Sequence, residues 1–407
     1  MFACSRAHIV SDLFDPTKGS EFQVPQVALA ALARCHAGPI LLWTTRRGSN
    51  ERHIQTWLTQ RGLDNRVELR LVDMKRADAE GHHATPWHFL LDLTDLYRRA
   101  ADDIRKGEFV WKSGQANVLF NLIALLWLRC DILGPLTGLE RPWYGKTKGI
   151  TLRFRCRYAL YAAVLSVARR LLGIAHRWGR FRFVVAATSH DFSAMPVALQ
   201  SMSVHHPEVD VEDLIERVQE PPDCRPSELA SGTRLLWAGA LIERKNPLLA
   251  LEIFAQVLSR HPEAQARMIG AGPLHSAVET ALAAQDCSIR GRLTLQEFVS
   301  RSDFILLLGQ IDILLVTSVR EANSVLVLEA LAAGVTVVST GVSGMLDTVR
   351  RSGYLFEIGG DSLVDRAVFE LDAAISFGAK TSPRQSLMQE HKVQRDRLVR
   401  MIKEVLK

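Results

Sequence analysis

Two glutamates on either side of a predicted helix start are the residues of this sequence best suited to chemistry. Glu321 and Glu329 lie in the run Arg320 to Gly334, which follows the apolar strand pattern Ile311 to Thr317. Eight residues of helix rise about 12 Å, so the pair could hold two ends of one extended ligand. The free N–H groups and positive dipole end of the helix start favour a phosphate.

Loops after other predicted strands supply further groups that a sugar nucleotide would need. Gly239 lets a ligand approach the backbone, and Arg244 and Lys245 lie at the start of a helix. Positive charge there would stabilise a diphosphate, above all as it leaves. The turn Gly270 to Gly272 leads into a helix with Pro273 in its first turn. Several such loops in order predict one wall of a ligand site.

Short β-branched runs alternate with longer helical patterns, which predicts parallel sheets built from βαβ units. In the first half the predicted strands are Ala7–Leu13, Pro39–Thr44, Val67–Val72, Glu108–Lys112, Ile132–Leu133 and Phe181–Ala186. The helices predicted between them are Val24–Cys35, Glu51–Arg61, Trp87–Arg105, Asn117–Arg129 and a basic segment within Arg141–Arg182.

The proline-containing stretch Gln219 to Gly232 has the composition of a linker between domains. After it, the predicted strands are Arg234–Ala238, Ala266–Ile269, Ser288–Arg290, Ile311–Thr317, Val335–Ser339 and Tyr354–Ile358. The predicted helices are Pro247–Arg260, Leu274–Ala284, Leu295–Leu308, Ser324–Ala333, Met345–Arg351, Leu363–Ser376 and Arg384–Leu406. We therefore expect domains over residues 1–228 and 229–383, and a helix over 384–407 that crosses back to the first domain.

Length and composition indicate a globular protein of two domains, because 407 residues exceed one ordinary core and 47% of them are apolar. The six cysteines are widely spaced and contain no Cys-x-x-Cys pair, which is typical of reduced cytoplasmic thiols. The longest apolar run, Val118 to Leu128, is much shorter than the roughly 20 residues that span a bilayer. We expect a cytoplasmic protein with no transmembrane helix and no secretion signal.

Basic residues concentrate between Arg141 and His190, where eleven Lys or Arg side chains occur without any Asp or Glu. Within this segment, Ile150 to Trp178 mixes arginines with apolar residues, as a helix lying on an anionic membrane surface does. A core helix with a solvated basic face has the same composition, so both interpretations stay open. No nucleic-acid motif accompanies the charge, and we expect no nucleic-acid partner.

The loops of the second half resemble the donor domain of family 4 retaining glycosyltransferases, which have the GT-B fold. The resemblance rests on Gly239 to Pro247, Ile269 to Pro273 and Thr317 to Val338, and it covers Thr233 to Arg351 well. It implies an α/β protein of two Rossmann-like, doubly wound parallel-sheet domains facing across a cleft. The implied reaction moves a hexose from a nucleotide-diphosphate sugar to a saccharide or lipid-linked saccharide, with retention and without a metal or other cofactor.

The resemblance also assigns roles to single residues. Glu321 and Lys245 would be catalytic, because Glu321 would contact the transferred sugar and Lys245 would hold the diphosphate. Glu329 would bind the ribose hydroxyls. The remaining residues expected to bind the donor are Arg244, Gly239, Gly270, Gly272, Asn323, Ser324, Val325 and, from the first half of the chain, Gly19.

The acceptor side is expected in the first half of the chain. There, Lys18 to Glu21 and Gly134 to Glu140 look like loops of a bacterial branch of the family that makes cell-surface polysaccharide or lipopolysaccharide. With the basic segment 141–182, this suggests a peripheral enzyme on the inner membrane face. The residues expected on the acceptor side are Ser20, Glu21, Lys112, Gly138, Glu140 and His190.

Three departures from the family pattern leave other functions open. Ala240 replaces an arginine, Ala322 to Ser324 replaces Gly-Phe-Gly, and Lys112 stands where histidine is frequent. A partner subunit that binds a nucleotide sugar but turns it over weakly would fit these changes. A sugar-nucleotide epimerase of the same architecture would release an altered sugar without needing an acceptor. Product analysis with the donor alone distinguishes the epimerase from a transferase. Stabilisation by a nucleotide sugar without transfer to any acceptor would indicate the partner subunit.

Overall fold

The computed structural model describes residues 6–407, apart from 17–23, 48–49, 79–82, 115–117, 137–150, 187, 189–191, 194, 201–202, 206–210, 218–231, 298, 322–323, 343–347 and 358–361. The chain forms two compact units. One comprises Met1–Glu140, Ala163–Asp210 and His391–Lys407, and the other Arg141–Ala162 and Val211–Glu390. The predicted linker, 219–232, and the predicted boundary near residue 228 lie almost wholly outside the described residues.

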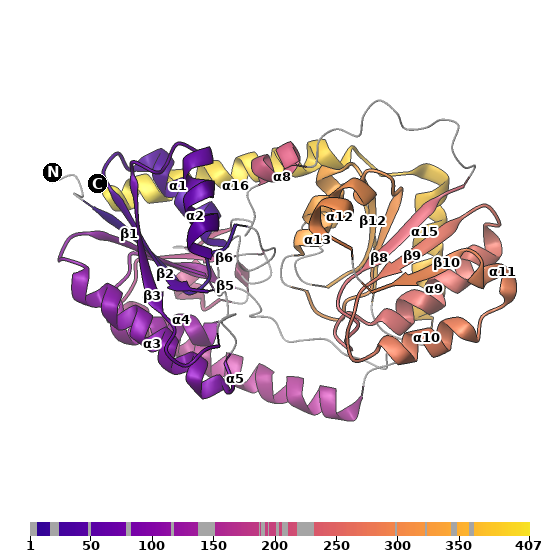
Figure 1. The fold of residues 1–407 in the computed structure, drawn as a ribbon, viewed down its shortest axis with the longest axis horizontal. Coiled ribbons are helices and arrows are strands. Elements are labelled where there is room, and N and C mark those ends of the chain that lie inside the picture. The colour runs from indigo at the N-terminus through magenta and orange to yellow at the C-terminus, as the bar shows by residue number, and fades with distance from the viewer. Residues whose placement is uncertain are drawn as a thin grey trace. The chain divides into compact units, whose positions relative to one another are not determined.

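The first unit is built on a seven-stranded sheet in the order β3-β2-β1-β4-β5-β6-β7, and all neighbouring strands pair in parallel (Figure 1). The chain starts in the middle of the sheet and winds outward in both directions, as doubly wound folds do. Its strands are β1 (Ala7–Ser11), β2 (Ile40–Arg46), β3 (Val67–Asp73), β4 (Phe109–Ser113), β5 (Ile132–Leu136), β6 (Phe183–Ala186) and β7 (Ser203–His205). Its helices are α1 (Val24–Cys35), α2 (Asn50–Gln60), α3 (Pro86–Asp103), α4 (Val118–Trp127), most of α5 (Leu152–Arg177), α7 (Val197–Gln200) and the end of α16 (Pro383–Leu406).

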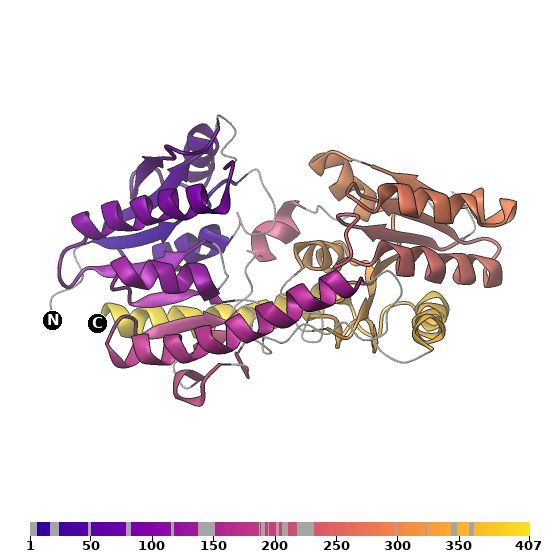
Figure 2. The same cartoon turned by 90° about the horizontal axis from the view of Figure 1, so that it is seen from below.

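The core of the first unit lies on both faces of its sheet. All five residues of β1 are buried, because a parallel sheet is covered on both faces. Ile9 and Trp111 of the sheet share one apolar cluster with Leu29 of α1. Leu398 and Ile402 of α16 join the same cluster, so the end of the last helix is part of this core (Figure 2).

The second unit contains a six-stranded parallel sheet in the order β10-β9-β8-β11-β12-β13. Its strands are β8 (Arg234–Ala238), β9 (Gln265–Ile269), β10 (Leu293–Gln296), β11 (Ile313–Val316), β12 (Thr336–Thr340) and β13 (Tyr354–Phe356). Its helices are α8 (Val211–Arg217), α9 (Pro247–Arg260), α10 (His275–Ala283), α11 (Cys287–Arg290), α12 (Arg301–Leu308), α13 (Val325–Ala332), α15 (Leu363–Phe377) and the first part of α16. The predicted class of two doubly wound parallel sheets is confirmed.

One predicted strand is wrong. Ser288 to Arg290 belongs to the helical turn α11, and the third strand of this unit is β10, which takes up the start of the helix predicted over Leu295–Leu308. The reason lies in local sequence, because Gly291 closes the helical turn and the alternation Leu-Thr-Leu-Gln after it suits a half-buried edge strand. Helix α12 then begins at Arg301, where Ser300 caps it through a hydrogen bond from the Asp303 N–H.

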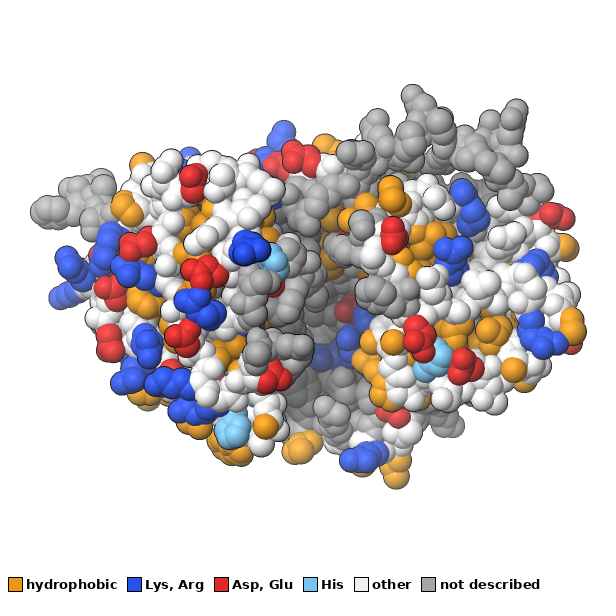
Figure 3. All heavy atoms as spheres, viewed as in Figure 1, with side chains coloured by type: hydrophobic (Ala, Val, Ile, Leu, Met, Phe, Trp, Pro, Cys, Tyr) orange, Lys and Arg blue, Asp and Glu red, His pale blue; other side chains and the backbone are white. Residues whose placement is uncertain are grey.

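The surface of both units mixes cationic, anionic and apolar side chains (Figure 3). None of the helices in the described part of the chain combines the length and apolar character needed to cross a membrane. Helix α5 is amphipathic only in part. Leu165 and Leu172 are buried, whereas Leu160, Val167 and Leu171 are between 45% and 69% exposed.

Candidate functional site

Three of the predicted site residues meet in the second unit. The Glu321 carboxylate accepts a hydrogen bond from Lys245 Nζ at 2.5 Å and from Arg244 Nη1 at 3.3 Å, both on Oε2. The Ser318 hydroxyl donates to the same oxygen at 3.1 Å. Two cations and one hydroxyl therefore share one carboxylate oxygen, and this cluster carries an excess of positive charge.

Two loops that follow neighbouring strands bring the cluster together. The loop after β8 carries Arg244 and Lys245, and the loop after β11 carries Ser318 and Glu321. Strands β8 and β11 pair in parallel, so their carboxyl ends lie at the same edge of the sheet. The Val319 N–H donates to the Arg244 carbonyl at 2.9 Å and joins the two loops through their backbones.

Thr317 fixes the base of the same two loops. Its hydroxyl lies 2.8 Å from the Lys245 carbonyl and 3.1 Å from the Asn246 carbonyl, and it accepts from the Trp237 indole N–H at 2.9 Å. Asn246 adopts a left-handed conformation, with φ of 51°, directly before Pro247 starts α9. The backbone that presents Lys245 is therefore held on both sides.

The charges around Glu321 keep its carboxylate ionised. Burial alone would raise its pKa, but the positive charges of Lys245 and Arg244 outweigh burial and hold the pKa below its ordinary value. A carboxylate with a lowered pKa accepts hydrogen bonds and does not donate a proton at neutral pH. Glu321 is therefore suited to bind hydroxyl groups, and not to act as a general acid.

The predicted glycine turns pack directly on each other. A β-carbon on Gly270 would come within 1.9 Å of the Gly239 carbonyl oxygen, and one on Gly272 within 2.7 Å of the Leu241 carbonyl oxygen. Hydrogen bonds from Gly239 N–H to the Ile269 carbonyl and from Leu241 N–H to the Ala271 carbonyl close the contact. Glycine at 270 and 272 is required by this close packing, which sets the position of the loop that bears Lys245.

Helix α13 carries the remaining predicted donor-binding residues that are described. Ser324 precedes the helix, and its side chain makes no capping hydrogen bond, so it leaves the N–H groups of the first turn to other partners. Val325 is the first helical residue, and Glu329 is 1% exposed one turn further along. Asn323 lies outside the described residues.

In the first unit, the side chain of Lys112 forms a buried ion pair with Asp12. Its Nζ lies 4.0 Å from Asp12 Oδ1, and neither side chain has exposed surface. Lys112 therefore reaches a ligand only if its surroundings rearrange, and its direct neighbour is the loop that follows β1. The other expected residues of the first unit, Gly19, Ser20, Glu21, Gly138, Glu140 and His190, lie outside the described part of the chain.

Sequence reasoning overlooked the two polar residues that organise the cluster. Thr317 and Ser318 follow the apolar strand β11 directly, and a Thr-Ser pair at the end of a buried parallel strand was the signal available. The described segments contain no group of three or more His, Cys, Asp or Glu side chains that could hold a metal ion.

Part of the second unit matches a known family model. Residues 232–371 match the model of the family "Glycosyl transferases group 1". No curated protein sequence matches the chain. The matched range contains Arg244, Lys245, Glu321 and Glu329.

Solved glycosyltransferase structures share the fold of the whole chain. A glycosyltransferase from Rickettsia africae ESF-5 superposes with a TM-score of 0.59 at 15% identity, over 100% of both chains. HepE from Anabaena, solved in complex with UDP and glucose, gives 0.60 at 14% over 99% of each chain. Sucrose-phosphate synthase from Thermosynechococcus elongatus gives 0.63 at 11% over 98% of each. The chain thus has the GT-B fold.

Proposed function

We propose that this protein transfers a hexose from a nucleotide-diphosphate sugar to a saccharide or lipid-linked saccharide, with retention of configuration. The observation that carries the proposal is the convergence of Arg244, Lys245 and Glu321 within a group 1 glycosyltransferase domain. HepE, a protein of similar fold, binds UDP and glucose. Retention and family 4 membership rest on the sequence resemblance described above.

In the proposed reaction the bond between the sugar C1 and the diphosphate oxygen breaks, and its electron pair stays on the diphosphate. A new bond forms between C1 and an acceptor oxygen, whose proton is released. Lys245 and Arg244 would stabilise the charge that develops on the leaving diphosphate. Glu321, which is ionised, would accept hydrogen bonds from hydroxyls of the sugar, and Glu329 would do so for the ribose.

The excess positive charge of the cluster supports a role for Arg244 in place of the arginine missing at Ala240. Arg244 Nη1 donates both to Glu321 and to the Arg320 carbonyl, so its guanidinium is held close to Lys245. Two adjacent cations suit a diphosphate, and no metal is needed for the proposed step.

The proposal also includes a location. Helix α5 belongs to the basic segment 141–182 and keeps Leu160, Val167 and Leu171 exposed beside its arginines. A solvated face of a core helix would not need these apolar side chains. We extend the proposal to a peripheral enzyme of cell-surface polysaccharide or lipopolysaccharide synthesis on an anionic membrane face.

Product analysis tests the proposed reaction. The purified protein is incubated with each nucleotide sugar, with and without a saccharide acceptor, and the nucleotide and sugar products are separated. A transferase releases nucleoside diphosphate and forms a glycoside whose yield depends on the acceptor. An epimerase changes the sugar in the absence of an acceptor, and a binding subunit leaves the donor intact. Either of the last two results would overturn the proposal.

A further inference from the structure

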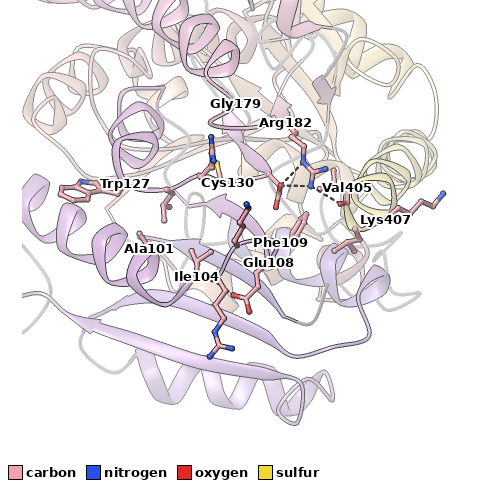
Figure 4. Close-up of a pocket in the computed structure, with 17 residues that line it drawn as sticks. Ala101, Ile104, Glu108, Phe109, Trp127, Cys130, Gly179, Arg182, Val405 and Lys407 are labelled. Atoms are coloured by element: carbon pink, nitrogen blue, oxygen red, sulfur yellow. Dashed lines mark hydrogen bonds and ion pairs between the residues drawn. The ribbon is translucent and has the colours of Figure 1, made fainter. Parts of the chain in front are cut away.

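A pocket of about 530 Å³ opens at the opposite edge of the first sheet from Lys112 (Figure 4). Phe109 begins β4, and Asp131 and Arg182 directly precede β5 and β6, so the pocket lies at the amino ends of these strands. The carboxyl end of β4, at Ser113, is about 13 Å away along the strand. The pocket is therefore separate from the residues assigned to sugar transfer.

The two carboxylates of the pocket are already paired within the protein. Glu108 accepts hydrogen bonds from Arg6 Nε at 2.7 Å and from the Arg105 N–H at 2.9 Å. Asp131 accepts from the Val110 N–H at 2.9 Å and pairs with Arg182 at 2.8 Å. Their negative charge is thus neutralised by internal partners.

Three further cations on the turns before β4 and β5 reach the pocket without such partners, and Lys407, which follows α16, lines the pocket as well. Arg105, Lys106 and Arg129 line it, and their side chains make no ion pair or hydrogen bond with any described residue. They come from the turn before β4 and the turn before β5. A concave surface with three cations beyond its paired charges attracts anions, and arginine and lysine together suit a phosphate group.

The turns that carry these cations are held in place by the backbone. The Glu108 N–H donates to the Arg105 carbonyl at 3.2 Å, and Gly107 between them has φ of 91°, a conformation that favours glycine. Arg180 donates from Nε to the Leu125 carbonyl at 2.9 Å, which ties the end of α4 to the turn after α5. The pocket is therefore preorganised.

One exposed tryptophan lines the pocket, and two more exposed apolar residues are next in sequence to lining residues. Trp127 lines the pocket and is 42% exposed, Leu126 beside it is 74% exposed, and Trp178, next to the lining residue Gly179, is 73% exposed. Tryptophan is enriched at the boundary between lipid and water, where its ring sits among the headgroups. Cations together with an exposed tryptophan in the lining match a phosphate attached to an apolar chain.

We propose that this pocket binds the phosphate group of an anionic ligand, carried by a membrane lipid whose headgroup enters between Arg105, Lys106 and Arg129. Trp127 and Trp178 then lie in the interfacial layer of the membrane. The site would dock the protein on an anionic membrane and takes no part in sugar transfer. This proposal is therefore independent of the proposed enzymatic function.

The test uses the full chain in two arms. In the first arm, flotation measures binding to vesicles that contain phosphatidylglycerol and to vesicles of phosphatidylcholine alone. In the second arm, thermal unfolding is followed with inorganic phosphate and with glycerol phosphate. The test variant is Lys106→Ala/Arg129→Ala, and its matched control is Arg52→Ala/Lys75→Ala, which removes the same two charges from exposed positions outside the pocket.

Each cation near an anionic surface changes affinity about fivefold, so the test variant should bind phosphatidylglycerol vesicles roughly 30-fold more weakly than the control. Trp127→Ala should also weaken vesicle binding, whereas Trp87→Ala, which removes a more exposed tryptophan outside the pocket, should not. A different result is that inorganic phosphate or glycerol phosphate stabilises the wild type but not the test variant, while the vesicles do not bind. The pocket would then be a phosphate site whose ligand is soluble and not a membrane lipid. Equal behaviour of test and control variants in both arms would overturn the proposal.

Discussion

Substitution of Lys245 and substitution of Glu321, which form an ion pair, should have opposite effects on the affinity for a nucleoside diphosphate. Lys245 would contact the diphosphate, so Lys245→Met should weaken binding. Glu321 would contact only the transferred hexose, which a nucleoside diphosphate lacks. Glu321→Gln removes the negative charge that now holds both Lys245 and Arg244, so it should tighten binding.

The magnitudes follow from the contacts of Glu321 Oε2. One hydrogen bond to a charged group contributes about 1.5–3 kcal/mol, and Lys245 must give up part of its 2.5 Å contact with Glu321 to bind the ligand. The loss in Lys245→Met should therefore be near the lower value, about tenfold in Kd. The gain in Glu321→Gln should be of the same size, because both cations are then available to the diphosphate.

Isothermal titration calorimetry with UDP, or with whichever nucleoside diphosphate binds the wild type, measures both effects. The control is Arg260→Met, which breaks an exposed ion pair with Asp372 in the same unit and should leave Kd unchanged. Urea unfolding shows that each variant is folded. If Glu321→Gln weakens the affinity as much as Lys245→Met does, the assignment of separate roles to the two residues is refuted.

Other parts of the structure give independent expectations. Gly270→Ala should lower the free energy of unfolding by about 1–3 kcal/mol, because its β-carbon would overlap the Gly239 carbonyl. In Gly291→Ala the new β-carbon would make only ordinary van der Waals contacts, so stability should change little; urea midpoints compare the two variants. Thr317→Val should destabilise by about 1–3 kcal/mol in the same assay, since it leaves buried hydrogen-bonding groups without a partner. For Glu108, burial would raise the pKa, but hydrogen bonds from Arg6 and from the Arg105 N–H lower it from 4.5 to about 2. The stability it contributes is present above pH 4.5 and is lost as pH falls towards 2, so Glu108→Gln should reduce this acid-dependent loss by about 3 kcal/mol when unfolding is measured against pH.

The doubly wound class was predictable because short apolar runs such as β11 alternate with longer helical patterns along the chain. The strand β10 was misplaced because it lies at the sheet edge, where half-burial weakens the pattern, and because the helical turn of Ser288 to Arg290 contains a branched apolar residue. Local sequence alone does not distinguish such a turn from a short strand.

The candidate site was predictable only as far as residue types reveal it. The sequence placed Arg244, Lys245 and Glu321 in neighbouring loops, but it could not show that Ser318 and two cations converge on a single oxygen. Nor could it show that Lys112 is buried against Asp12, because that contact joins β4 to the loop after β1, which is distant in sequence. The pocket at the amino ends of β4 to β6 arises in the same way, from turns that only the fold brings together.

Binding of a nucleotide sugar to the second unit is the central claim, and a thermal-shift screen of UDP-, GDP-, ADP- and dTDP-sugars tests it most directly. One of these donors should stabilise the wild type, by about 2.7 kcal/mol at a hundredfold excess over Kd. Glu329→Ala should reduce that stabilisation, because the ribose would lose its carboxylate partner. The account is contradicted if no nucleotide sugar stabilises the wild type, and the ribose assignment fails if Glu329→Ala responds as the wild type does.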